Sequence, residues 1–409
     1  MAAAAAALPN WVMLERFVFR RDDPNSFRED RRTSAACSTS TGARFDVSFV
    51  LAEPHTPSRL YLSWPEGPKD EWVCYLVAAH RDLVLLRLDS LVDESQPFGE
   101  VRHEYFIYIA DPTSQIPPLL RPLPQCMEHD SDLGRPLTFA FSPRAVGLLC
   151  HGEDEFAVAY LGVWWSHVTS EMEAELWVLR SSSSCCRDDG AENWEKQRLP
   201  IPYEEDDHLD GILVCDGIFG ESPKVAYIRF PVDTFVRDNP RRIRKELYRS
   251  LCVTDCGSRL VFVDVARHDG TGLGSMAPGT GFTMTFQTLE MAENDMMQYQ
   301  WIEDAVVTSD QLWAANTPSR LPREVMIIPL VSMDVPNIVH VVLFGWEIGS
   351  FLLVAIDSSD KQVLGSVVTY IESSEQGLST DDADLVRAKP TSFTHFLPSE
   401  FPKFLNLTR

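Results

Sequence analysis

Six basic side chains fall within thirteen residues of a chain that is otherwise strongly acidic, with 36 Lys and Arg against 60 Asp and Glu. Guanidinium groups bind carboxylates and phosphates through paired hydrogen bonds, so the cluster predicts a site for an acidic or phosphorylated peptide. The alternative is that the cluster pairs with the protein's own acidic residues from Glu204 to Asp207. The six residues are Arg237, Arg241, Arg242, Arg244, Lys245 and Arg249.

Catalytic motifs are missing from the sequence. It contains no G-x-S-x-G elbow, no H-E-x-x-H pair, no P-loop and no C-x-x-C pair, so no catalytic residue and no cofactor is predicted. A hydrolase or lyase stays open as an alternative, because a site can be assembled from residues that are distant in sequence. The candidates are His80 with Asp82, and His151 with Glu153 and Asp154.

Two groups of residues approach the spacing of metal ligands. Cys252 and Cys256 enclose three residues, but no second pair completes a tetrahedral site. The other group mixes soft and hard ligands on a proline-rich stretch, a pattern typical of a solvated loop. Its members are Cys126, Glu128, His129, Asp130 and Asp132. No metal site is therefore predicted.

Short runs of Val, Ile, Leu, Phe, Tyr and Trp alternate along the chain with clusters of Pro, Gly, Asp and Ser. This pattern is typical of strands joined by turns, and patterns of amphipathic helices are nearly absent. We count about twenty strands, which predicts an all-β (mainly β) protein. Clear examples are Phe45–Leu51, Leu83–Leu88, Phe156–Val163, Arg259–Val265, Phe282–Leu289 and Gln362–Tyr370.

A sheet of so many antiparallel strands would expose unpaired N–H and C=O groups on its edge strands. A closed ring of small sheets leaves only short, protected edges. We predict a β-propeller-like fold of about five to six irregular four-stranded blades with long loops, and two β-sandwich domains as the alternative. The surplus length falls in loops such as Pro117–Arg135 and Glu372–Lys389. Residues 1–10 are assigned to a disordered Ala-rich tail and residues 11–409 to a single domain.

The net charge of −24 argues against direct contact with nucleic acid or with a membrane, because both are bound chiefly through Lys and Arg. The apolar stretch Ile338–Ile356 is long enough to span a membrane, but Glu347 near its middle and a glycine on either side predict two buried strands in a hairpin. Nine irregularly spaced cysteines are typical of reduced thiols, and no signal peptide or transmembrane helix is recognised. We expect an intracellular protein of the cytoplasm or nucleus.

The apolar motifs of the chain also follow a characteristic order. They are Pro9-x-Trp11-Val12-x-Leu14-x-Arg16, Gly147-Leu148-Leu149, Leu176-Trp177 with Trp194, Gly211–Asp216, Leu260–Asp264, Leu353–Asp357 and Leu364–Val368. In order and spacing they resemble the plant family defined by domain of unknown function 1618 (DUF 1618), which is expanded in grasses. The resemblance spans nearly the whole chain and implies a plant protein with a mostly β body and no agreed biochemical activity.

Together these features favour a non-catalytic protein–protein interaction module over an enzyme. A rigid β body with long loops is suited to recognition, since binding residues are concentrated on loops that a scaffold positions. We therefore expect the partner to be another protein.

Overall fold

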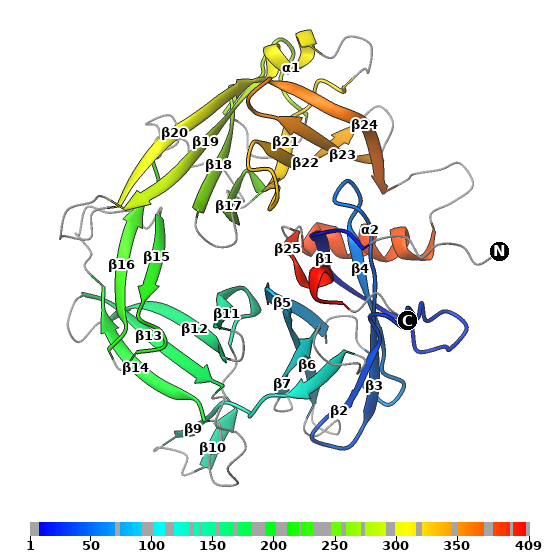
Figure 1. Cartoon of the computed structure of the whole chain (residues 1–409), viewed down its shortest axis with the longest axis vertical. Helices are drawn as coiled ribbons and strands as arrows, with labels where there is room; N and C mark the ends of the chain where they lie inside the picture. Colours follow the sequence, from blue (N-terminus) through cyan, green and yellow to red (C-terminus); the bar gives the residue numbers. More distant parts are fainter. Residues whose placement is uncertain are drawn as a thin grey trace.

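Figure 1 shows the computed structural model of the chain. The structure describes residues 8–405 apart from 70–73, 92–100, 111–117, 131–134, 139–140, 153–154, 167–170, 182–192, 202–210, 221, 232–246, 255–258, 271–274, 292–298, 316–320, 346–349, 372–378 and 393–395. Most of the described residues belong to short strands, which form small, mainly antiparallel sheets arranged around a common centre (Figure 1).

Five of these sheets have four or five strands and form the blades of a propeller. Blade 1 consists of β1 (Val12–Arg20), β2 (Ala35–Ser38), β3 (Arg44–Val50), β4 (Ser58–Ser63) and β25 (Leu397–Ser399). Blade 2 consists of β5 (Cys74–His80), β6 (Leu83–Leu91), β7 (Val101–Ile109) and β8 (Leu119–Pro122). Blade 3 consists of β11 (Val146–His151), β12 (Glu155–Ser166), β13 (Glu171–Arg180) and β14 (Glu195–Pro200). Blade 4 consists of β17 (Arg249–Thr254), β18 (Arg259–Arg267), β19 (Phe282–Met291) and β20 (Tyr299–Thr308), and blade 5 of β21 (Met326–Val331), β22 (Ile338–Gly345), β23 (Ser350–Asp357) and β24 (Gln362–Ile371).

Smaller elements connect and cover the blades. The two-stranded sheet of β15 (Gly211–Asp216) and β16 (Lys224–Arg229) lies between blades 3 and 4 (Figure 1). A second two-stranded sheet pairs β9 (Met127–Asp130) with β10 (Arg135–Thr138). The helical elements are α1 (Ser309–Ala315) after blade 4, α2 (Thr380–Ser392) after blade 5, and the 3-10 turns η1 (Pro143–Ala145) and η5 (Phe401–Phe404).

Blade 1 closes the ring because it contains strands from both ends of the described chain. Its order is β2-β3-β4-β1-β25. β1 pairs antiparallel with β25, with Val12 opposite Ser399, and parallel with β4 on its other side. The hydrogen bonds of one sheet therefore hold the N-terminal and C-terminal strands together, which removes the free edges that an open arc of blades would have.

Apolar side chains fill the boundaries between neighbouring blades. Between blades 1 and 2, for example, the ring of Phe49 lies 5.0 Å from that of Tyr108 and 4.9 Å from that of Phe401. All three side chains are fully buried. Since successive residues of a strand point to opposite faces, each blade presents an apolar face to each neighbour, and stacking of these faces forms the core.

The prediction of an all-β, propeller-like protein is confirmed, with five blades and the β15–β16 hairpin, and the two-sandwich alternative is wrong. The stretch Ile338–Ile356 lies in β22 and β23, which pair antiparallel as predicted. No helix in the described part of the chain is long and apolar enough to cross a membrane. The six cysteines within the described residues have free thiols, as expected.

Two predicted loops contain regular structure. Residues 117–135 include β8 and β9, and residues 372–389 overlap α2. The helix is stabilised locally because the Ser379 hydroxyl accepts a hydrogen bond from the Asp382 N–H at its first turn. Leu385 and Ala388 are buried beneath it. Most residues of this segment are polar, so the short apolar stripe of the helix gives no clear amphipathic pattern in the sequence.

Candidate functional site

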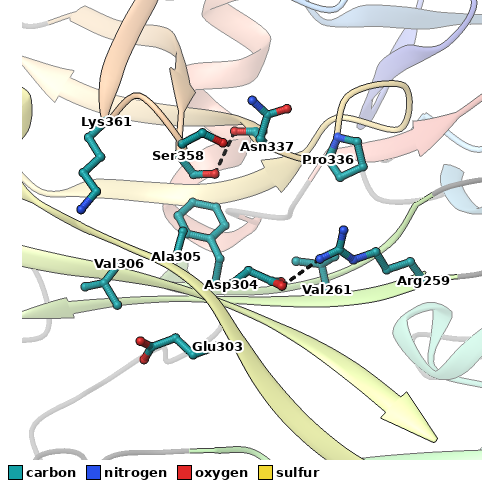
Figure 2. Close-up of a pocket in the computed structure, with 12 residues that line it drawn as sticks. Arg259, Val261, Glu303, Asp304, Ala305, Val306, Pro336, Asn337, Ser358 and Lys361 are labelled. Atoms are coloured by element: carbon teal, nitrogen blue, oxygen red, sulfur yellow. Dashed lines mark hydrogen bonds and ion pairs between the residues drawn. The ribbon is translucent and has the colours of Figure 1, made fainter.

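A groove of about 660 Å³ lies where blade 4 faces the turns of blade 5. Figure 2 shows β18, β19 and β20 on one side, and the β21–β22 and β23–β24 turns on the other. The floor of the groove on blade 4 is apolar and is formed by Val261, Phe286 and Ala305. Val261 and Phe286 are each 2% exposed, so the blade core supports the floor from behind.

A β-bulge shapes the blade 4 side of the groove. Phe286 pairs with Ala305 and Gln287 pairs with Glu303, so Asp304 is an extra residue in β20. Such a bulge redirects the side chain of the inserted residue. The Asp304 carboxylate accepts hydrogen bonds from Arg259 Nη2 at 2.9 Å and from the Thr288 hydroxyl at 2.5 Å. Arg259 Nε also donates to Thr288 Oγ1 at 2.9 Å, which closes a triad of three mutually bonded side chains.

Two linked turns form the blade 5 side. The Ser358 N–H and hydroxyl donate to the Asn337 carbonyl oxygen at 2.8 and 3.0 Å (Figure 2). The Asn337 amide nitrogen donates to Asp357 Oδ1 at 3.0 Å, and the same oxygen accepts the N–H of Ser359 at 2.8 Å. Although partial burial opposes the change, these hydrogen bonds and that of the Asp360 N–H lower the pKa of Asp357 below its ordinary value. The carboxylate therefore stays ionised at neutral pH and holds both turns in place.

Two charged side chains of the groove have no partner within the described part of the chain. They are Glu303, which is exposed on β20, and Lys361, which is half-buried in the β23–β24 turn at a φ of 56°. Figure 2 shows Lys361 extending from its turn toward the blade 4 side, and Glu303 pointing away from the Arg259–Asp304 pair. Because Glu303 pairs with Gln287 across the strands, its side chain lies on the face of blade 4 opposite Phe286 and Ala305. Among the described residues, the groove thus combines an apolar floor, an internally neutral ion pair and the free ammonium group of Lys361.

Most of the basic cluster that the sequence indicated lies outside the described residues. This applies to Arg237, Arg241, Arg242, Arg244 and Lys245, and to the acidic residues 204–207 proposed as their internal partners. Arg249 is described and is 8% exposed. Its Nε donates to Asp264 at 2.7 Å, and its guanidinium lies over the ring of Phe230 at 5.9 Å. The side chain of Arg249 is thus directed into the protein and pairs with Asp264, which lies outside the acidic residues 204–207.

The histidines considered for a channel site have structural contacts. The Cys150 N–H donates to His80 Nδ1 at 2.7 Å, and the Cys150 thiol donates to the His80 carbonyl oxygen at 3.2 Å. Burial lowers the pKa of His80, and burial raises that of Cys150 to about 12. At neutral pH the imidazole is therefore uncharged and the thiol is protonated, and the pair links β5 of blade 2 to β11 of blade 3.

The structure does not bring the other candidate catalytic and metal-binding residues together in one site. His151 Nδ1 lies 3.3 Å from Glu155 on the surface, whereas Glu153 and Asp154 lie outside the described residues. Cys252 is buried in the core, and Cys256 and Asp132 are not described. Where the structure describes side chains, no three His, Cys, Asp or Glu residues are close enough to hold a metal ion.

The groove was missed because its residues come from two strand pairs and two turns that are far apart in sequence. One local signal was present. Glu303 and Asp304 are consecutive polar residues in a strand, where polar and apolar residues should alternate, and a break in alternation is the mark of a bulge.

The ring of small sheets places the chain among the β-propeller proteins. Residues 207–340 match the model of a family described as Protein of unknown function (DUF1618). The domain family that the motifs resembled is therefore the one matched. The matched segment contains the β15–β16 hairpin, all of blade 4 and β21, and with them the blade 4 side of the groove and Asn337. A comparison with curated proteins gave no match.

Proposed function

We propose that this protein is a non-catalytic interaction module that binds a segment of another protein in the groove between blades 4 and 5. The observation that carries the proposal is the ammonium group of Lys361, which has no partner among the described residues, beside an apolar floor. Charged side chains that lack an internal partner are available for charge-assisted hydrogen bonds with a ligand. The bonded turns and the triad behind them hold the site in one geometry, which lowers the entropic cost of binding.

The shape of the groove supports a peptide segment as its ligand. Glu303, Asp304 and Ser359 are exposed along its edges, so the groove is open to solvent along the surface. Small-molecule sites are usually concave pockets that enclose most of the ligand surface, whereas an open groove accepts an extended segment. The net charge of −24 supports a protein partner rather than nucleic acid or a membrane surface. The family resemblance supports a plant protein, and the irregularly spaced cysteines support one that acts inside the cell.

The test is selection of ligands from a displayed random-peptide library on the folded protein, followed by affinity measurements for wild type and for S359W. Ser359 is exposed in the β23–β24 turn, and an indole at this position would fill the groove. The matched control is S222W, which places the same side chain on the exposed β15–β16 turn. We expect S359W to weaken binding at least about tenfold and S222W to leave it unchanged. Failure of any peptide to be enriched, or equal binding by S359W and wild type, would contradict the proposal.

A further inference from the structure

Blade 1 carries a group of three arginines that the acidic residues of α2 already occupy. We propose that this group, called here the arginine site, binds an acidic segment of another protein in exchange for α2. The site is separate from the groove between blades 4 and 5 and does not depend on the function proposed for that groove. Its arginines are Arg21, Arg28 and Arg59, and the acidic residues that occupy it are Asp381, Asp382 and Asp384.

Blade 1 itself helps to hold the arginines in place. The rings of Phe19 and Tyr61, which are paired on the neighbouring strands β1 and β4, lie 5.3 Å apart. The guanidinium groups of Arg21 and Arg59 lie 5.9 and 5.1 Å from the centre of the Phe19 ring. That of Arg28 lies 5.5 Å from the centre of the Tyr61 ring. These cation–π contacts do not involve α2, so they hold positive charge on blade 1 for whichever acidic ligand is bound.

The contacts of Asp381 show which ligand group the site recognises. Its carboxylate is 4% exposed and accepts hydrogen bonds from the Tyr61 hydroxyl at 2.6 Å and from Arg21 Nη2 at 2.5 Å. Burial, together with the bonded Asp381, raises the pKa of Tyr61 to about 12, so the hydroxyl is a donor at neutral pH. A carboxylate fits this position because it accepts from a hydroxyl and a guanidinium at once.

Two further acidic residues of α2 complete the charge balance. Asp384 pairs with Arg21 at 2.8 Å, and Asp382 pairs with Arg59 at 3.4 Å. Three closely spaced carboxylates of α2 thus face three guanidinium groups of blade 1. A matching partner segment therefore carries several acidic residues close together. The net charge of −24 opposes binding of such a segment over most of the surface, which favours this site.

The helix is attached to blade 1 mainly through charge. Among the described side chains of α2, the buried apolar ones are Leu385 and Ala388, and Val386 is 40% exposed. An acidic segment that makes the same ion pairs therefore has little apolar contact to offset. α2 contributes no strand to any blade, so its displacement leaves the paired strands of the ring in place. Because α2 belongs to the same chain, it competes at a high effective concentration and keeps the site filled in the free protein.

A peptide from α2 itself tests the proposal. The probe is a fluorescently labelled peptide of residues 379–388, and the control peptide has Asn in place of its three Asp residues. We expect D381N/D382N/D384N to bind the probe at least about tenfold more tightly than the wild type does, by fluorescence anisotropy, since its own helix competes less. E53Q/E66Q/D310N makes the same change of net charge at exposed positions and should bind as the wild type does.

A further substitution tests where the peptide binds. Added to D381N/D382N/D384N, R59Q should weaken binding of the probe about tenfold, because it removes one guanidinium group of the site. R44Q removes an exposed arginine of β3 in the same blade and should leave binding unchanged. Equal losses in R59Q and R44Q would place the peptide elsewhere and overturn the inference.

Hydrogen–deuterium exchange of the wild type decides the question if circular dichroism shows that the triple variant does not fold. An excess of the acidic peptide should speed exchange of the amides at residues 381–388, and the Asn peptide should not. Unchanged exchange at millimolar acidic peptide would overturn the inference, as would a folded triple variant that binds the probe no better than the wild type does. Neither result bears on the groove, which S359W tests separately.

Discussion

Two boundaries between blades of the propeller differ in how far their charged side chains are paired. Between blades 5 and 1, Asp381 of α2 is 4% exposed and accepts hydrogen bonds from Tyr61 at 2.6 Å and Arg21 at 2.5 Å. Arg59 and Arg28 lie within 3.5 Å of the same carboxylate. Between blades 4 and 5, Arg259 and Asp304 pair with each other, and the half-buried Lys361 has no partner among the described residues.

The difference distinguishes a boundary that holds the ring closed from one that is available to a ligand. A buried charge is tolerated only when its bonds are complete, so the Asp381 cluster fastens α2 to blade 1 in one position. An unpaired charge must remain solvated, and it keeps the blade 4–5 boundary open at the surface. The first boundary should therefore dominate stability, and the second should dominate binding.

The largest effect on stability is expected for D381N. Burial alone would raise the pKa of Asp381, but hydrogen bonds from Tyr61 and Arg21 lower it, so the wild-type carboxylate is ionised at neutral pH. Removing its charge leaves Arg21 with only Asp384 and Arg59 with only Asp382 as acidic partners among the described residues, and should lower the free energy of unfolding by about 3–5 kcal/mol. Urea denaturation measures this change.

The neighbouring Asp382 provides the control for that experiment. It is 16% exposed and has one ion pair, with Arg59 at 3.4 Å. D382N should cost less than about 1 kcal/mol. A similar loss in D381N and D382N would show that the cluster does not close this boundary.

The next effect is a dependence of stability on pH that arises from His340, which is 3% exposed on β22. Burial, with a smaller contribution from the nearby His55, lowers the pKa of His340 to about 4. Trp11 of the chain segment leading into blade 1 lies 5.6 Å away, ring to ring. Between the unfolded pKa near 6.5 and about 4, the unfolded chain binds a proton that the folded protein excludes. The free energy of unfolding should therefore fall by about 3 kcal/mol as the pH decreases through this window.

H340N should remove most of that pH dependence, as measured by urea denaturation at several pH values. H151N, which changes an exposed histidine on β11, should retain it. Part of the dependence of the free energy of unfolding on pH should remain in H340N, because burial also lowers the pKa of His80. An unchanged slope in H340N would mean that His340 is not excluded from protonation in the folded state.

A smaller effect is expected at the groove, where T288V removes the hydroxyl that connects Arg259 to Asp304. Thr288 is 6% exposed, and its hydroxyl both donates and accepts in the triad. The substitution keeps the shape of the side chain and should cost about 1–3 kcal/mol by thermal or urea denaturation. T56V, on an exposed turn, should be neutral. A neutral T288V would indicate that the triad does not brace the groove.

The strands were predictable because each boundary needs apolar side chains at alternate positions, and the sequence shows this pattern directly in segments such as Arg259–Val265 and Phe282–Leu289. The ring followed from the need of many short strands to cover their edges. Short edge strands such as β2 and β25 carry too few residues to show a pattern. The parallel pairing of β1 with β4 depends on ring closure, which no local signal encodes.

The groove could be predicted far less well. Its charged residues come from β18, β20 and the β23–β24 turn, and only the fold brings Arg259, Asp304 and Lys361 to one place. The basic cluster at residues 237–249 was conspicuous in sequence, yet Arg249 is bonded internally to Asp264. A cluster of like charges in sequence reports composition, whereas a site depends on which charges remain unpaired after folding.

The central claim is that the groove between blades 4 and 5 receives the partner. Hydrogen–deuterium exchange of the protein with and without a selected peptide tests it most directly, because binding slows exchange of the backbone amides that it covers. The account predicts slower exchange at residues 303–306 and 358–361 and no change at His80 and Cys150, on β5 and β11, the strands of blades 2 and 3 nearest the centre of the ring (Figure 1). Slower exchange confined to the centre of the ring, or to a blade other than 4 and 5, would contradict it.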